Sequence, residues 1–249
     1  MTRPTYGRPL ALLAVVAALA ACDEKKDSSS PAAPASAPPK ETPKAAPPTD
    51  RPIDITVDAE GFLVAGDRAA GAEGQRKMRE LVAKLELKGK PPTVIALRSA
   101  KAGDVAALFG ALAGVGATDV TVRTQDRSKK DVTRTMIADS KAGKLQDCTV
   151  ALMVQKDRTT ASWPIRGGMA TRYAKGMAGP DLSMTLEGVK KQVAACTSSA
   201  MVLSGDDSVE WGLVFDLSQM ATTADPPLKI TTFVVAHEAL TAGRKVPLE

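Results

Sequence analysis

One order of apolar patterns occurs twice along this chain, and it constrains the fold more than any other feature of the sequence. Each copy begins with apolar residues that alternate around a turn, and continues as helix, strand, helix and strand. The first copy covers residues 54–124 and the second covers residues 148–235. We therefore predict an α+β fold of two tandem two-layer units, each a small mixed sheet packed by two helices. The alternative is one larger α+β domain in which similar elements recur by chance.

The predicted elements can be placed by their residue ranges. The first copy contains a hairpin at 54–67, a helix at 73–87, a strand at 92–97, a helix at 103–116 and a strand at 117–124. The second contains a strand, turn and strand at 148–167, a glycine- and cation-rich insertion at 166–180, a helix at 181–196, a strand at 198–204, a helix at 208–221 and a strand at 229–235. An offset of 106 residues, the difference between Val94 and Ala200, aligns the two copies.

The amino-terminal segment differs from the rest of the chain. Arg3 and Arg8 precede an apolar run at 11–20, a layout typical of a secretory signal peptide. The run is shorter than the roughly 20 apolar residues that a membrane-spanning helix needs. It closes on LAAC, residues 19–22, which resembles a bacterial lipobox and implies cleavage before Cys22 and acylation of its thiol. A buried helix of the fold is the alternative. More than one acyl chain would anchor the protein stably to a membrane.

The residues after Cys22 predict a tether. Asp23 resembles the inner-membrane retention signal of enterobacterial lipoproteins, which slightly favours the inner membrane and a periplasmic location. Residues 23–51 are rich in Pro, Ala and Ser and contain almost no large apolar side chain, so they cannot bury a core. We predict a spacer that holds the folded part away from the membrane.

Composition excludes several classes of partner and cofactor. The formal net charge is +5, and it falls to about +3 (31 basic and 28 acidic residues) once Arg3 and Arg8 leave with the signal peptide. This mild charge, with only 3% aromatic residues, does not predict a nucleic-acid surface. The single histidine, His237, cannot build a typical zinc site. We predict no metal and no cofactor.

Two cysteines remain once Cys22 is acylated. Cys148 and Cys196 would lie in an oxidising compartment, where they can form one disulfide. We place Cys148 at the start of a strand and Cys196 on the apolar face of a helix. Two buried free thiols are the alternative.

The sequence contains no recognisable catalytic motif. There is no G-x-S-x-G, H-E-x-x-H or Walker A stretch, and no cysteine and histidine at nucleophile–base spacing. Asp206, Asp207 and Glu210 cluster before a helix, where carboxylates more often cap the helix than act as acid and base. We predict that the chain is not an enzyme, with a hydrolase of unrecognised site as an alternative.

The insertion at 166–180 is the most site-like surface. Arg166, Arg172 and Lys175 lie there, with Trp163 and Tyr173 nearby. These cations predict contact with the acidic stem peptides of the cell wall or with an acidic face of a partner protein. A solvated loop without a ligand is the alternative.

The first copy resembles the periplasmic domain of the ExbD/TolR family. The resemblance lies in ITVDAEGFLVAG, a following helix, and PTVIALRSAKAGDVAALFGALAGVGATDVTVRT, where Asp58, Gly61, Gly103 and Gly116 fall on the family pattern. It implies an accessory role in biopolymer transport or energy transduction, with ExbB- or TolQ-like partners, peptidoglycan, or a second copy in a homodimer. The chain departs from the family because a lipobox replaces the transmembrane helix with its aspartate, and because LRSAKA (97–102) replaces the family's acidic loop.

These inferences give a domain plan and a function. We predict a signal peptide at 1–21, the lipidated cysteine and linker at 22–51, an ExbD/TolR-like unit at 52–125, a connector at 126–147, a diverged second unit at 148–238, and a tail at 239–249. The expected function is that of a non-catalytic, membrane-anchored envelope lipoprotein, accessory to an energy-transduction system or bound to peptidoglycan. The alternative is a structural or interaction lipoprotein of an unrelated envelope complex.

Overall fold

The computed structural model describes residues 54–87 and 89–248, within a compact unit that spans Thr49–Glu249. The predicted signal peptide, the lipobox cysteine Cys22 and the whole linker lie outside the described residues, so these inferences stay predictions.

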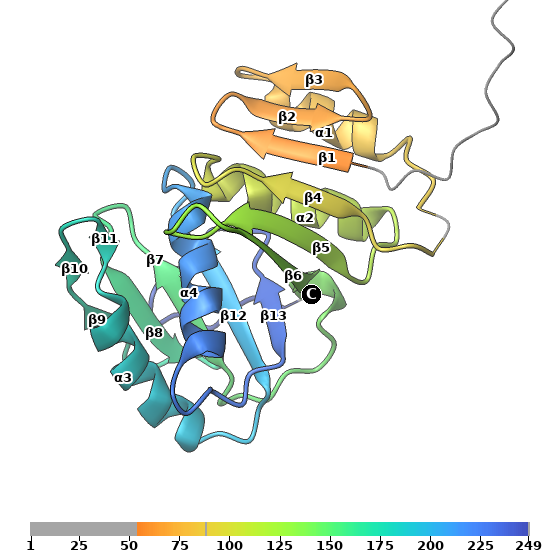
Figure 1. Ribbon diagram of the computed structural model, residues 1–249. Helices are drawn as coiled ribbons and strands as arrows, with labels where there is room; N and C mark the ends of the chain where they lie inside the picture. The colour runs from red at the N-terminus through yellow and green to blue at the C-terminus, as the bar shows by residue number, and fades with distance from the viewer. Residues whose placement is uncertain (1–53, 88, 249) are drawn as a thin grey trace, which may run out of the picture. The chain divides into compact units, whose positions relative to one another are not determined.

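The described residues form one large mixed sheet and four α-helices (Figure 1). The strands are β1 (Asp54–Asp58), β2 (Gly61–Val64), β3 (Asp67–Ala70), β4 (Thr93–Ala96), β5 (Val120–Gln125), β6 (Asp131–Ala138), β7 (Val150–Val154), β8 (Thr160–Pro164), β9 (Thr171–Tyr173), β12 (Ala200–Gly205) and β13 (Thr232–Val235). A separate hairpin pairs β10 (Lys175–Gly176) with β11 (Gly179–Pro180). The helices are α1 (Gly74–Val82), α2 (Ala102–Gly114), α3 (Leu182–Ala194) and α4 (Trp211–Thr223), and η1 (Asp139–Lys141) is a 3₁₀ turn.

The strands of both predicted units belong to a single sheet. Its order is β3-β2-β1-β4-β5-β6-β13-β12-β7-β8-β9. Strands β1, β4 and β5 are parallel to one another, as are β7, β12 and β13. The predicted mixture of helices and a mixed sheet is therefore confirmed, but one sheet of 11 strands replaces two separate small sheets.

Strand β6 joins the two halves of the sheet. It pairs antiparallel with β5 and parallel with β13, and it lies in the stretch 126–147 that the sequence analysis treats only as a connector. The alternation of apolar and polar residues that marks a strand is hidden in β6, because Arg134 takes a position that faces the helices. Its guanidinium lies 5.0 Å from the centre of the Phe233 ring and donates a hydrogen bond to Thr222 on α4. Burial lowers the pKa of Arg134.

All four helices contribute to one hydrophobic core against one face of the sheet. Met78 from α1, Phe109 from α2, Val189 from α3 and Phe215 from α4 are fully buried in it. In Figure 1, α1 and α2 are seen behind β1 and β4, whereas α4 is seen in front of β12, as expected when a sheet twists along its width. The core is thus continuous from one half of the sheet to the other.

A second, smaller core covers the opposite face of the carboxyl-terminal half. Met153 and Trp163 from β7 and β8 are buried there against Leu240 and Val246. Strand β7 is consequently buried along its whole length, which explains its unbroken apolar sequence VALMV.

The helix ends differ in part from the predictions. Helix α1 ends at Val82 rather than at residue 87. Asp181 caps α3, because its side chain accepts hydrogen bonds from the backbone N–H groups of Ser183 and Met184. Glu210 occupies the N-cap position of α4 without a side-chain cap bond, so the predicted capping role is wrong there. Its carboxylate instead lies 3.6 Å from Arg158.

The turn between β1 and β2 requires glycine and holds an ion pair. Gly61 has φ +134°, and a Cβ atom at this position would lie 2.4 Å from the carbonyl oxygen of Ala69. The Asp58 carboxylate accepts hydrogen bonds from the backbone N–H of Glu60 (2.8 Å) and from Arg68 (2.7 Å). The bond from Arg68 holds the pKa of Asp58 below its usual value near 3.8, although burial acts in the opposite direction.

This lowered pKa predicts an acid-sensitive contribution to stability. Above pH 4 the ionised Asp58 stabilises the fold, and this contribution is lost as the pH falls through the lower pKa of the folded state. We expect Asp58→Asn to lower the free energy of unfolding by about 1 kcal/mol at neutral pH, because the pair is partly exposed. Urea unfolding at neutral pH and at about pH 3 measures the difference, which should shrink in acid. Asp67→Asn, at an exposed position of β3, is the matched control. A difference that stays constant with pH would contradict the assignment.

Candidate interaction surface

The structure separates the three cations of the predicted contact surface. Arg166 follows β8, Arg172 lies in β9 and Lys175 lies in β10, and all three are exposed. Because β8 and β9 are antiparallel and Ala161 pairs with Arg172, Arg166 and Lys175 lie at opposite ends of this strand pair. The structure brings Arg172 and Lys175 to one edge of the sheet and leaves Arg166 apart.

The two aromatic residues expected beside these cations belong to the interior. Trp163 is fully buried, and its Nε1–H donates a hydrogen bond to the carbonyl oxygen of Arg244 (2.8 Å). Tyr173 is 7% exposed, and its hydroxyl lies 2.9 Å from that of Ser162. Trp163 therefore contributes nothing to the exposed surface, whereas the largely buried Tyr173 reaches it only as part of a groove lining.

A groove runs between β9 and α3. Its volume is about 540 Å³, and Thr171 and Tyr173 from β9 face Met184, Gly188 and Lys191 from α3. A Cβ atom at Gly188 would lie 2.1 Å from the Tyr173 hydroxyl, so the ring rests directly on the helix backbone. The groove is not apparent from the sequence, although its walls are close in the chain, because it depends on how α3 packs on β8 and β9.

Buried hydroxyl groups fix α3 beside this groove. Thr160 and Thr185 form a hydrogen bond of 2.7 Å, and Thr185 also donates to the carbonyl oxygen of Asp181 (2.7 Å). Both threonines are fully buried. Because a buried hydroxyl without a partner is costly, this chain of bonds specifies how α3 lies on β8. The polar residues of TASW (160–163) are the signal in the sequence.

Within the described part of the chain, positive charge without an ion pair lies in the groove, at Lys191, and on the neighbouring edge of the sheet, at Arg172. Among the described residues, no carboxylate oxygen lies within 4.0 Å of the charged groups of Arg172, Lys175 or Lys191. The acidic residue in the lining, Glu187, is paired with Lys190 at 3.0 Å. The surface is therefore complementary to a negatively charged ligand.

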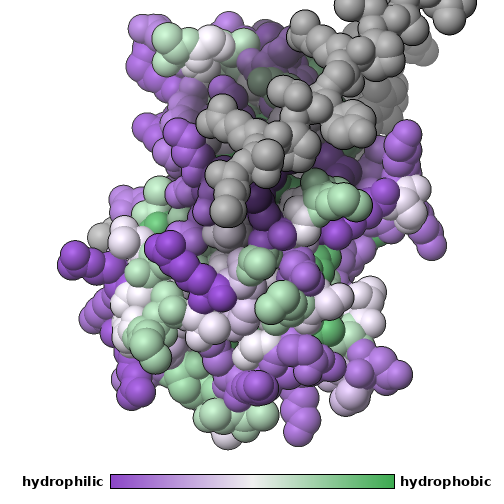
Figure 2. All heavy atoms as spheres, turned by 90° about the vertical axis from the view of Figure 1, so that its left-hand side faces the viewer, coloured by the Kyte–Doolittle hydropathy of each residue, from purple (hydrophilic) through white to green (hydrophobic). Residues whose placement is uncertain are grey.

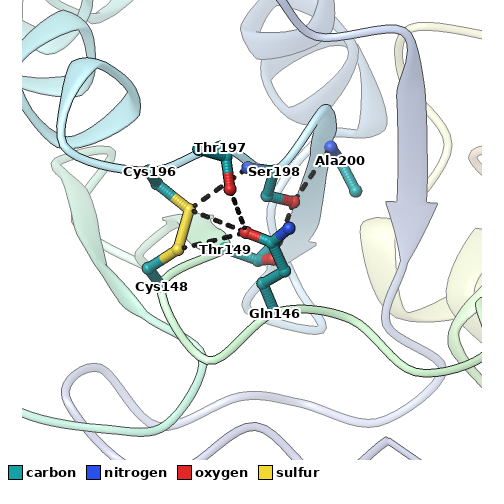
Figure 3. The surroundings of a disulfide bond; sticks show 7 residues. All are labelled: Gln146, Cys148, Thr149, Cys196, Thr197, Ser198 and Ala200. Atoms are coloured by element: carbon teal, nitrogen blue, oxygen red, sulfur yellow. Dashed lines mark hydrogen bonds between the residues drawn. A yellow bond between two sulfur atoms is a disulfide. The ribbon is translucent and has the colours of Figure 1, made fainter.

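A disulfide closes the far end of α3 (Figure 3). The sulfur atoms of Cys148 and Cys196 lie 2.07 Å apart, and the Cα atoms lie 5.6 Å apart. Cys196 follows the last residue of α3, and Cys148 precedes β7, so neither lies within the element proposed for it.

Polar contacts accompany this disulfide. In Figure 3, Thr197 donates a hydrogen bond to the Oε1 atom of Gln146 (2.9 Å), and Thr149 donates to the hydroxyl of Ser198 (2.8 Å). The end of α3 is thus tied covalently and by hydrogen bonds to the segment that leads into β7.

A buried ion cluster joins the two halves of the molecule. The Asp216 side chain on α4 is 3% exposed and accepts two hydrogen bonds from Arg98 (2.8 and 2.9 Å) and one from Nε of Arg127 (2.7 Å). The bond to Asp216 raises the pKa of Arg98. Residues far apart in the chain form the cluster, so the sequence analysis could not identify it.

Backbone hydrogen bonds also join the loop that precedes α2 to the loop that precedes α4. The N–H of Ala102 donates to the carbonyl oxygen of Val209 (2.8 Å), and the N–H of Trp211 donates to that of Ala100 (2.7 Å). The indole Nε1–H of Trp211 also donates to the hydroxyl of Thr124 (3.0 Å). The loops are thereby held against each other.

His237 has a structural position. Its Nδ1 atom lies 2.7 Å from the buried carboxylate of Asp139, and its Cβ atom faces the backbone of α2 at Gly110. No group of three or more His, Cys, Asp or Glu side chains within residues 54–87 and 89–248 could hold a metal ion. None of the helices within these ranges is long and apolar enough to cross a membrane.

Comparison with known proteins gives no relative for this chain. No family model, no curated protein and no solved structure matches it.

Proposed function

We propose that this protein is a non-catalytic, membrane-anchored envelope lipoprotein related to the ExbD/TolR family. It would serve as an accessory to an energy-transduction or biopolymer transport system, or bind peptidoglycan. The element order of the first half supports the proposal most directly. Three antiparallel strands, a helix, a strand, a helix and a strand follow one another, and all but the third strand, β3, stand in the order that the resemblance of residues 53–125 implies. The lipobox that ends at Cys22 supplies the anchor.

We also propose that the two halves are copies of one unit. Strands β3-β2-β1-β4-β5 and strands β9-β8-β7-β12-β13 occupy matching places in the sheet, read from its two edges inward. In each set, two helices flank the fourth strand in the sequence, namely α1 and α2 around β4, and α3 and α4 around β12. Such agreement of order and direction favours duplication over chance recurrence.

The structural match gives a different offset from the sequence alignment. Helices α2 and α4 have 13 residues each and begin at Ala102 and Trp211, 109 residues apart. Their N-cap residues, Lys101 and Glu210, face each other in an isolated β-bridge. The offset of 106 is three residues short. Apolar residues recur every three to four positions on a helix, so an alignment by pattern can slip by almost one turn.

One observation favours the alternative of an interaction lipoprotein in an unrelated envelope complex. The loop at 97–102, which departs from the family pattern, is held by the loop before α4, and Ala100 and Ala102 are buried. A partner would therefore have to bind elsewhere, and the exposed cations beside α3 offer such a place.

Co-sedimentation with isolated peptidoglycan sacculi tests the proposal. Residues 22–249 with Cys22→Ser contain all of the described residues and lack the predicted signal peptide. We expect this protein to pellet with sacculi at low salt and less at high salt, because salt screens exposed charges. Affinity purification of ExbB- or TolQ-like proteins from an envelope extract tests the second arm. Protein that stays in the supernatant at both salts and retains no such partner would overturn the proposal.

A further inference from the structure

We propose that the groove between β9 and α3 binds an acidic peptide in extended conformation, which adds to the sheet as a strand beside β9. The inference deepens the proposed role in partner binding by giving it a place and a ligand chemistry. It rests on the geometry of the carboxyl-terminal half alone, so it can be tested without sacculi or motor proteins.

The orientation of β8 follows from hydrogen bonds at its two ends. The N–H of Ile165 donates to the carbonyl oxygen of Thr149, and the N–H of Gln155 donates to that of Thr159, each at 2.9 Å. In an antiparallel pair the bonding residues alternate. The odd-numbered residues of β8 therefore bond to β7, and the even-numbered residues face β9.

The same alternation leaves the outer edge of β9 open at Arg172, whereas the next outward carbonyl oxygen, that of Ala174, accepts a hydrogen bond from the N–H of Asp181 (3.1 Å). Thr160 and Ser162 of β8 pair with Tyr173 and Thr171, which thus direct their backbone groups toward β8. The backbone N–H and C=O of Arg172 point the other way, and no strand of the described residues lies beyond β9 in the sheet. An added strand can exchange main-chain hydrogen bonds with Arg172, which is the mode of β-strand addition.

The groove offers an apolar contact to side chains of such a strand. Met184 on α3 is 55% exposed, and Tyr173 forms part of the lining. Side chains of a strand alternate between its two faces, so every second residue of the ligand would face α3. Figure 2 looks onto the side that carries α3 and β9–β11, and apolar residues are interspersed there among polar ones.

Charge selects the ligand. Lys191 lines the groove, and Arg172 lies on the edge strand with its side chain on the other face of the sheet. Neither has an ion pair among the described residues, whereas Glu187 is paired and Lys175 on β10 acts electrostatically on Asp157. A segment with carboxylates at alternate positions and apolar residues between them matches both features.

The opposite edge of the sheet lacks this combination. Arg68, the cation of the edge strand β3, is paired with Asp58 and Glu60. Helix α1 begins four residues after β3, whereas the hairpin β10–β11 separates β9 from α3. Helix α3 therefore begins nine residues after the edge strand β9.

Fluorescence anisotropy with a labelled dodecapeptide of alternating glutamate and valine tests the inference. We expect binding by residues 22–249 (Cys22→Ser) with a dissociation constant of about 10–100 μM, typical of a small peptide interface. The peptide with lysine in place of glutamate should bind at least tenfold more weakly. A peptide N-methylated at every residue cannot donate main-chain hydrogen bonds and should not bind. Equal binding of all three peptides, or binding of none, would overturn the proposal.

Two pairs of variants locate the site. Arg172→Ala removes one charge, whereas Arg172→Pro also removes the outward N–H, which an edge strand tolerates. We expect the proline variant to bind at least fivefold more weakly than the alanine variant. Lys191→Glu should weaken binding about tenfold, whereas Lys77→Glu, exposed on α1, should not. Circular dichroism verifies folding. If the two variants of each pair weaken peptide binding equally, the proposed site is wrong, even if the protein still pellets with sacculi.

Discussion

Replacement of Cys148 and Cys196 together by serine is expected to lower the free energy of unfolding by about 4 kcal/mol. The disulfide spans 48 residues of sequence, and a cross-link of this length restricts the unfolded chain by about that amount. Guanidinium chloride unfolding of the oxidised wild-type and double-serine proteins measures the effect. Wild-type protein kept in reductant should match the double variant.

A second readout tests where this disulfide acts. It fixes the end of α3, and its loss should loosen α3 before the rest of the fold. Hydrogen exchange should accelerate in α3 and remain slow in α2, which lies in the other half. Equal unfolding midpoints for oxidised and reduced wild-type protein would contradict the prediction.

Substitution Asp216→Ala is expected to lower the free energy of unfolding by about 3 kcal/mol. The carboxylate is almost fully buried, and its removal leaves Arg98 and Arg127 without their partner. The estimate lies at the lower end of the range for broken buried pairs, since the Arg127 side chain is 46% exposed and can be hydrated. Urea unfolding monitored by tryptophan fluorescence measures the loss.

Two further variants separate the pair from general disruption of α4. Arg127→Ala should cost about 1 kcal/mol, since the remaining bonds from Arg98 keep Asp216 paired. In a double-mutant cycle, Arg98→Ala and Asp216→Ala together should cost clearly less than the sum of the single changes. Additive losses would show that the two side chains do not stabilise each other.

Local patterns were sufficient to predict most elements. The spacing of Val105, Leu108, Phe109 and Leu112 predicted α2, and the run PTVIAL predicted β4, each within two residues at either end. Strand β6 escaped prediction because a cation replaces an apolar residue in its alternation. No local pattern could show that β6 would bond β5 to β13, since that pairing joins segments about 100 residues apart.

The candidate site was predictable only in part. Exposure of Arg172 and Lys175 followed from the polar insertion, but their separation from Arg166 depends on the register of β8 and β9. Tyr173 was expected near the exposed cations, and its ring is instead buried against the backbone of α3 at Gly188, where there is no side chain. Lys191 entered the site only through tertiary packing. Charge was visible in the sequence, whereas the open strand edge was not.

The position of β13 has a consequence for the order of folding. This strand is the last of the sheet in the sequence, yet it lies between β6 and β12 in its interior. When the chain folds in order from its amino terminus, the amino-terminal half can pair its strands only up to β6, whose outer edge stays unpaired until β13 is available. Completion of the sheet therefore waits for contacts between distant parts of the chain, which slows folding. Until then, a chaperone could occupy the place of β13.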